Sequence, residues 1–194
     1  KTRGGITIGF GRFNPPTAGH GKLVDAVKKV AGTDEYRIYP SHSCDPKKNP
    51  LGCEEKVDWM KASYPEHANN IVFDSKMKTI FDVLQAAHNA GYRSVNIVVG
   101  ADRLKEFERL ANDYNGQLYS FDTINVVSAG DRNPDAEGVE GMSASKLRKA
   151  AAEGDFDTFA KGLSQELSDK AKKDLYNSVR LNMNIMDQIK LSKI

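Results

Sequence analysis

The chain has 194 residues, of which 39% are hydrophobic and 28% charged, a composition typical of a soluble globular protein with a buried core. Its formal net charge of +2 predicts no nucleic-acid partner. No apolar run approaches the ~20 residues that cross a bilayer, and the first residues lack the apolar core of a signal peptide. We therefore expect a cytoplasmic protein without a membrane partner.

Hydrophobic periodicity predicts strands that alternate with helices. Strands are expected over residues 6–10, 36–40, 71–73, 94–99 and 123–128. Helices are expected from a cap at Thr17 to Gly32, over 54–63, from a cap at Thr79 to Gly91, over 103–114, over 145–153 and throughout from Asp155 onward, with a turn-rich stretch over 130–141. This alternation predicts an α/β fold, a Rossmann-like parallel sheet with helices on both faces.

We divide the chain into an α/β domain over residues 1–153 and a C-terminal helical extension over residues 154–194, packed on or beside the core. The packing positions of the extension are Phe156, Phe159, Leu163 and Leu167. The cysteines, Cys44 and Cys53, lie near His42 in a stretch with loop composition that contains neither a CxxC nor an HxxxH pair. We expect free thiols and no metal site there.

Ligands of parallel sheets bind at the carboxyl ends of the strands, and the first strand leads into GFGRFNPPTAGH. This stretch is not a P-loop, because Leu23 follows Gly21-Lys22 and Pro16 occupies the upstream glycine position. It is not a dinucleotide fingerprint, because Asn14 stands at the third glycine. It still has features of an anion site: Gly9 and Gly11 lack a Cβ that would obstruct a phosphate, and two prolines stiffen the turn. Thr17 and His20, three residues apart, can face one ligand at the positive helix N-terminus.

Two motifs together resemble the HxGH-type nucleotidyltransferase superfamily. GRFNPPTAGH resembles its GxFxPxHxGH signature, with Thr17 in place of the first histidine. MSASKLR resembles its second motif, ISSTxxR, with Ser143, Ser145 and Arg148 at the key positions. Either serine can cap a helix, and Arg148, one turn later, can bind phosphate oxygens. A plain helix cap followed by a solvated arginine would give the same second pattern.

The resemblance covers about residues 5–150 and implies attack of an acceptor phosphate on the α-phosphorus of a nucleoside triphosphate, with release of pyrophosphate. His20 would donate to the α-phosphate, Mg²⁺ would bridge the phosphates, and Thr17 would share the catalytic site. The β- and γ-phosphates would be held by Arg12, Lys22 and Arg148. The remaining nucleotide-binding positions would be Gly9, Phe10, Gly11, Gly100, Asp102, Ser143 and Ser145, with Asp102 equally able to cap the following helix.

The segment SHSCDPKKNPLGCEEKVDWM is similar to archaeal-type nicotinamide mononucleotide adenylyltransferases through Ser41, His42, Lys48 and Asn49, although Lys56 stands at an arginine position. A solvated basic loop is the alternative. The leading expectation is therefore transfer of AMP from ATP to nicotinamide mononucleotide, giving NAD. A cytidylyltransferase or a phosphopantetheine-type adenylyltransferase stays open, and so does a regulatory nucleotide-binding module without turnover, which Thr17 favours. The family often self-associates, which leaves a homo-oligomer open.

Overall fold

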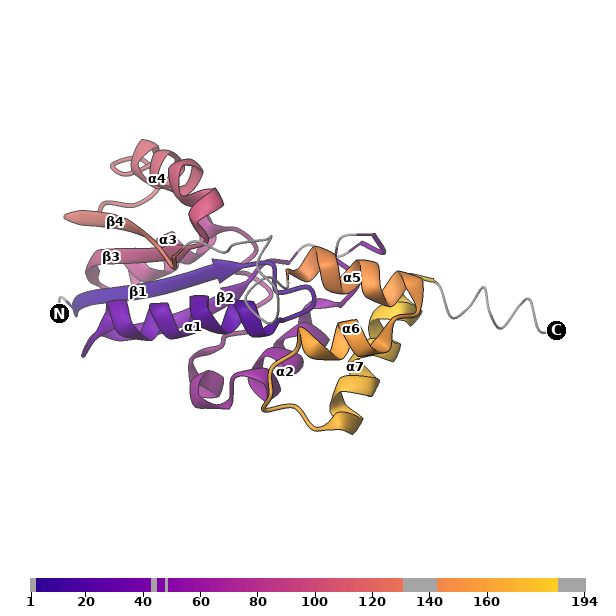
Figure 1. The fold of residues 1–194 in the computed structure, drawn as a ribbon. Helices are drawn as coiled ribbons and strands as arrows, with labels where there is room; N and C mark the ends of the chain where they lie inside the picture. The colour runs from indigo at the N-terminus through magenta and orange to yellow at the C-terminus, as the bar shows by residue number, and fades with distance from the viewer. Residues whose placement is uncertain (1–2, 43–44, 48, 131–142, 185–194) are drawn as a thin grey trace. The chain divides into compact units, whose positions relative to one another are not determined.

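A parallel sheet of four strands, in the order β2-β1-β3-β4, organises the first part of the chain (Figure 1). The structure is a computed structural model that describes residues 3–42, 45–47, 49–130 and 143–184. The strands are β1 (Arg3–Gly11), β2 (Glu35–Pro40), β3 (Tyr92–Val99) and β4 (Thr123–Ser128). Gly9 of β1 pairs with Ile38 of β2 and Val98 of β3, so the carboxyl ends of three strands lie at one edge. The predicted Rossmann-like α/β fold is confirmed.

Helices cover both faces of this sheet, and apolar side chains are buried on both faces, although one face also carries the hydrogen-bonded pair Thr7 and Asn96. On one face, alternate residues of β1 such as Ile6 and Ile8 share a core with α3 (Ile80–Asn89) and α4 (Leu104–Asp113). On the other face, Val27 of α1 (Ala18–Ala31) lies against Gly9. Thr79 starts α3 in a capping box with Asp82, as its position in the sequence predicts.

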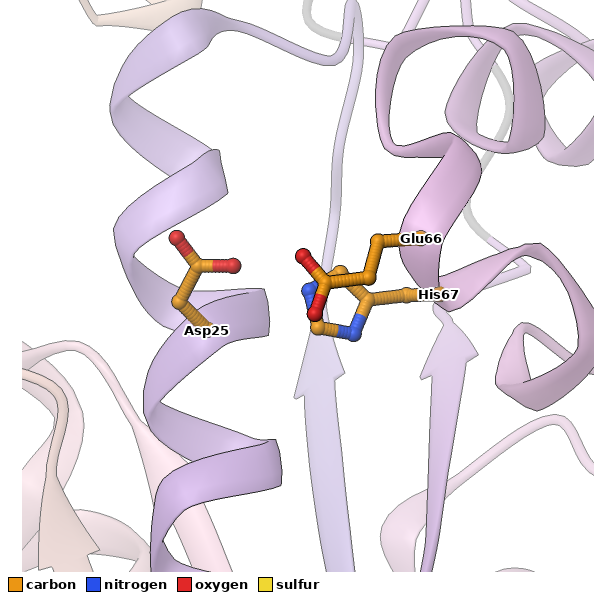
Figure 2. Close-up of side chains that lie close together, drawn as sticks. All are labelled: Asp25, Glu66 and His67. Atoms are coloured by element: carbon orange, nitrogen blue, oxygen red, sulfur yellow. The ribbon is translucent and has the colours of Figure 1, made fainter.

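The chain divides into two compact units. The first contains Lys1–Gly11, Lys22–Ser41 and Asn69–Arg132, and therefore the sheet; the second contains Arg12–Gly21, His42–Ala68 and Asn133–Ile194. The helices of the second unit are α2 (Cys53–Ser63), most of η1 (Pro65–Asn70), α5 (Ala144–Glu153), α6 (Phe156–Lys161) and α7 (Asp169–Asn182). Figure 2 shows the side chains of Glu66 and His67, which are neighbours on η1. Glu66 is exposed and His67 is buried.

The second unit has its own apolar core, which α5, α6 and α7 share. Three of the four predicted packing positions of the C-terminal segment, Phe159, Leu163 and Leu167, are buried in it, and the fourth, Phe156, is half-buried and packs against it. The predicted boundary after residue 153 falls between α5 and α6, two helices of this one core. Polar contacts also join the C-terminal segment to α2: the hydroxyl of Ser164 donates to the carbonyl of Ser63 (2.7 Å), and Ser178 donates to Glu55.

Two predicted elements are wrong. Residues 71–73 form no strand, because only Ile71 makes an isolated bridge to Ile38 before the chain turns at Asp74. The chain is not continuously helical from Asp155, because α6 ends at Gly162 and α7 begins only after its cap, Ser168. Apolar spacing continues through the interruption, since Leu163 and Leu167 are buried outside any helix, and that spacing resembles helical periodicity.

Several sequence predictions lie outside the described residues: Cys44, Lys48, residues 131–141 of the turn-rich stretch, and Met142 of the second motif. Cys53, at the start of α2, is a free thiol. Within the described ranges, none of the helices combines the length and the apolar character that crossing a membrane requires.

Adding a methyl group at Gly9 is expected to destabilise the first unit. The new Cβ would lie 2.6 Å from Cγ2 of Val27, so the Gly9→Ala variant should lose about 1–3 kcal/mol in the free energy of unfolding, measured by urea denaturation. Gly4→Ala is the matched control, because it lies in the same strand and its Cβ would meet its nearest neighbour, Asp34, at 4.0 Å. Adding Val27→Ala to Gly9→Ala should cost less than the two separate losses predict. Strictly additive losses would contradict this account.

Candidate active site

The loop between β1 and α1 is held in an unusual backbone conformation. Phe13 has a φ of 48°, in the left-handed region that a bulky residue rarely adopts, and its side chain is completely buried. The Asn14–Pro15 peptide bond is cis. The ring of Phe13 packs against the ring of His20, with centroids 4.9 Å apart. Burial of Phe13 therefore fixes the path of the loop and holds the Phe13 ring beside the imidazole of His20.

Asn14 fastens this loop to the segment before α2. Its amide nitrogen donates to the carbonyl of Leu51 (3.0 Å), and its amide oxygen accepts from the backbone N–H of Leu51 (2.8 Å). Both residues are fully buried, and Leu51 belongs to the core of the second unit. In the sequence, Asn14 only interrupts a glycine pattern, because a local pattern contains no signal for a partner 37 residues away.

The second motif reaches the first through Arg148. Ser143 caps α5 by accepting from the backbone N–H of Lys146 (3.2 Å), and its hydroxyl lies 2.9 Å from that of Ser145. One turn later, Nη1 of Arg148 donates to the backbone carbonyl of Asn14 (2.8 Å). The helix cap is Ser143, one of the two serines that the sequence left open, and the half-buried Arg148 is not a fully solvated side chain. The two motifs thus meet within the second unit.

Positive charge is concentrated where they meet. Burial is the main reason that the pKa of the Arg148 guanidinium is lowered, and the charge of Arg12 lowers it further, whereas Asp45 raises it. Arginine stays protonated in proteins despite such shifts, so the like charges of Arg12 and Arg148 repel each other. A phosphate group bound there would relieve this repulsion, because it can accept hydrogen bonds from guanidinium groups.

Thr17 and His20 contact each other at the start of α1. The backbone N–H of His20 donates to Oγ1 of Thr17 (3.1 Å), which confirms Thr17 as the predicted helix cap. The backbone N–H of Thr17 donates to Nδ1 of His20, also at 3.1 Å. The next N–H of the helix, that of Ala18, donates to the carbonyl of Gly162 (2.8 Å), and the hydroxyl of Tyr64 donates to the carbonyl of Thr17.

In the first unit, the predicted glycines lie at the carboxyl ends of β1 and β3. These two strands are neighbours, with β2 beside β1 and β4 beside β3, so their ends form the switch point at which such sheets bind ligands. Gly9 has a packing reason to be glycine, since Val27 fills the space of its Cβ. A Cβ at Gly100 would lie 2.8 Å from Oδ1 of Asp102, a contact that the exposed side chain of Asp102 can relieve by rotating. Gly11 accepts a bond from the backbone of Ser41 (2.7 Å).

The other predicted nucleotide-binding residues of the first unit differ in exposure. Asp102 is exposed and does not cap α4, whose N-cap is Arg103 without a side-chain cap bond. Lys22 is exposed on α1. The Phe10 side chain is buried, with its ring centroid 6.0 Å from that of Phe107, so this position offers only its backbone to a ligand.

Comparison with known proteins agrees with the two motifs. No curated protein matches the chain. Among solved structures, Plasmodium falciparum nicotinic acid mononucleotide adenylyltransferase in complex with NaAD has a TM-score of 0.59 and 15% identity, covering 93% of this chain and 98% of that one. The same enzyme in complex with APC has a TM-score of 0.55 and 15% identity, covering 94% of this chain and 97% of that one. Likeness at this identity shows a shared fold.

A family model described as Cytidylyltransferase-like matches residues 8–150, most of the chain. The matched range includes the loop from Arg12 to His20 and the described part of the second motif, from Ser143 to Arg148. The chain therefore belongs to the cytidylyltransferase-like family and is a nucleotidyltransferase, as its two motifs predict.

Proposed function

We propose that the protein transfers AMP from ATP to nicotinamide mononucleotide, giving NAD and pyrophosphate. The observation that carries this proposal is the bond from Arg148 to the carbonyl of Asn14, which joins the two motifs beside Arg12 in one cationic site. The middle segment, which is similar to archaeal-type nicotinamide mononucleotide adenylyltransferases, supports this acceptor. The two solved structures, whose enzyme acts on nicotinic acid mononucleotide, support a pyridine mononucleotide more generally.

In this proposal, an oxygen of the acceptor phosphate forms a bond to the α-phosphorus of ATP, and the bond from that phosphorus to the β-phosphate oxygen breaks. Arg12 and Arg148 bind the β- and γ-phosphates and stabilise the charge that collects on the leaving pyrophosphate. His20 donates a hydrogen bond to the α-phosphate as negative charge increases there. Lys22 adds positive charge for the triphosphate.

Such chemistry depends on positioning and charge stabilisation and needs no covalent nucleophile. Mg²⁺ fits this site as an ion that arrives with ATP. The groups near Arg148 are the guanidinium of Arg12, serine hydroxyls and the carboxylate of Asp45, whose oxygens already accept hydrogen bonds from Lys47 and Asn49. Phosphate oxygens and water would therefore be the principal ligands of Mg²⁺. When bound, the ion neutralises part of the triphosphate charge. The cytoplasmic location expected from the sequence is compatible with these substrates.

Pyrophosphate release with paired substrates tests the reaction. We expect release with ATP and nicotinamide mononucleotide, and a product of the mass of NAD. The other substrate pairs to be tested are ATP with nicotinic acid mononucleotide or phosphopantetheine, and CTP with phosphocholine or glycerol phosphate. If pyrophosphate were released faster with one of these pairs, that pair would replace the proposed substrates. Binding of ATP without release for any pair would instead support a regulatory module.

Replacing His20 by alanine should lower kcat by ~10²-fold or more, the usual cost of losing one transition-state donor. The midpoint of thermal unfolding should fall by only a few degrees, because the bond from the backbone N–H of Thr17 to Nδ1 is lost while the side chain of Thr17 still caps the backbone N–H of residue 20. Steady-state kinetics and differential scanning calorimetry on one preparation measure both quantities. An unchanged kcat would remove His20 from the mechanism.

Replacing Arg148 by alanine should lower kcat/KM for ATP by about 10²-fold, because a charge-assisted contact to phosphate is lost. The Arg148→Lys variant should retain only part of the wild-type kcat/KM for ATP, since lysine keeps the charge but lacks the planar guanidinium with its paired donors. Tripolyphosphate should raise the unfolding temperature of the wild-type protein more than that of Arg148→Ala. The matched control is Arg93→Ala, which removes an exposed arginine 3.7 Å from Asp122. If tripolyphosphate raised the unfolding temperature of the wild-type protein, Arg148→Ala and Arg93→Ala equally, the result would contradict an anion site at Arg148.

A further inference from the structure

The contact between Thr17 and His20 has the reciprocal form of a capping box. In that motif, a hydroxyl at the N-cap accepts from a backbone N–H three residues later, and the side chain at that position accepts from the N-cap backbone. Here Thr17 Oγ1 accepts from His20 N, and His20 Nδ1 accepts from Thr17 N, both at 3.1 Å. The imidazole thus takes the place of the usual glutamate or glutamine.

This geometry decides which ring nitrogen of His20 carries the proton. A nitrogen that accepts a hydrogen bond from a peptide N–H presents a lone pair and has no hydrogen of its own. Neutral imidazole has a single N–H, so that hydrogen is on Nε2. The hydroxyl of Thr17 acts in the same direction: Oγ1 lies 3.3 Å from Nδ1, so its hydrogen can point to the same lone pair while its oxygen accepts from His20 N.

The surroundings of Thr17 direct its side chain to the histidine. Thr17 is only 1% exposed, and its carbonyl accepts from the hydroxyl of Tyr64. His20 is half-buried, and the ring of Phe13 packs against its imidazole. Of this pair, the histidine has the larger surface for a ligand, whereas the threonine is almost completely buried.

We propose that Thr17 is a positioning residue that acts through His20. It holds the neutral imidazole as the Nε2–H tautomer in one rotamer, so that Nε2–H is the donor for the transferred phosphate. The inference rests on the proposed function of His20. It assigns Thr17 a different role from the direct ligand contact expected from the sequence.

The test compares two substitutions of Thr17 with one at another helix cap. Thr17→Val keeps the branched shape and removes the hydroxyl, while Thr17→Ser keeps the hydroxyl. Thr79→Val is the matched control, because Thr79 caps α3 in its own capping box with Asp82. The readouts are kcat, KM for ATP, and the tautomer of His20 from long-range ¹H–¹⁵N spectra. The chain has four histidines, and the signal of His20 is assigned by its loss in His20→Ala.

We expect wild-type protein to show the Nε2–H tautomer at His20. In Thr17→Val, kcat should fall about 10-fold, as expected when a cap bond no longer holds the ring, with KM for ATP within about 2-fold. Its spectrum should show a mixture of tautomers or a broadened His20 signal. Thr17→Ser should match the wild type in kcat and spectrum, and Thr79→Val should lower only the unfolding temperature.

Three results would overturn the inference. One is an Nδ1–H tautomer in the wild-type protein. The second is a Thr17→Val variant that keeps the wild-type kcat and spectrum. The third is a rise in KM for ATP in Thr17→Val while the His20 spectrum is unchanged, which would make Thr17 a direct ligand of the nucleotide. If wild-type protein has no turnover, the proposed function fails, and the spectra of the wild type and Thr17→Val still decide whether Thr17 fixes the ring.

Discussion

The hydrogen bond from Arg148 to the carbonyl of Asn14 joins residues 134 positions apart and is the contact on which the proposed site depends. That carbonyl is fixed because the Asn14 side chain is paired in both directions with the backbone of Leu51. Leu51 is itself part of the core that contains Leu147, the neighbour of Arg148 in sequence. Hydrophobic packing and the two buried hydrogen bonds of the Asn14 side chain therefore set the position of the Arg148 guanidinium before any ligand binds.

A preformed site of this kind carries an electrostatic cost in the absence of ligand. Arg148 is half-buried and feels the charge of Arg12, and Asp45 compensates only in part, since the pKa of Arg148 is lowered overall. The same repulsion becomes an advantage when an anion arrives, because binding then removes an unfavourable interaction and adds favourable ones. Groups already fixed in place also lose little side-chain entropy when they bind, which is the physical content of preorganisation.

The sequence predicts those features whose cause is local. Strand and helix periodicity locates all four strands of the sheet, and residue chemistry identifies Thr17 and Thr79 as helix caps. It narrows the cap of α5 to two serines, of which Ser143 is the cap. Features that depend on residues distant in the sequence are not predicted by it. The packing role of Gly9 depends on Val27, and that of Asn14 depends on Leu51. The false strand at residues 71–73 has suitable composition but pairs through Ile71 alone.

Thr17 shows how a departure from a sequence motif can be judged from local geometry. A threonine cannot carry the charge of the histidine expected there, which by itself suggests weaker binding of a triphosphate. Its hydroxyl, however, can accept from one backbone N–H and donate to the lone pair of His20 at the same time, in a position almost closed to solvent. In the proposed mechanism, the positive charge for phosphate binding comes instead from Arg12 and Arg148. This proposed division of charge and positioning among different residues makes threonine compatible with an active enzyme, so the presence of Thr17 does not by itself favour a module without turnover.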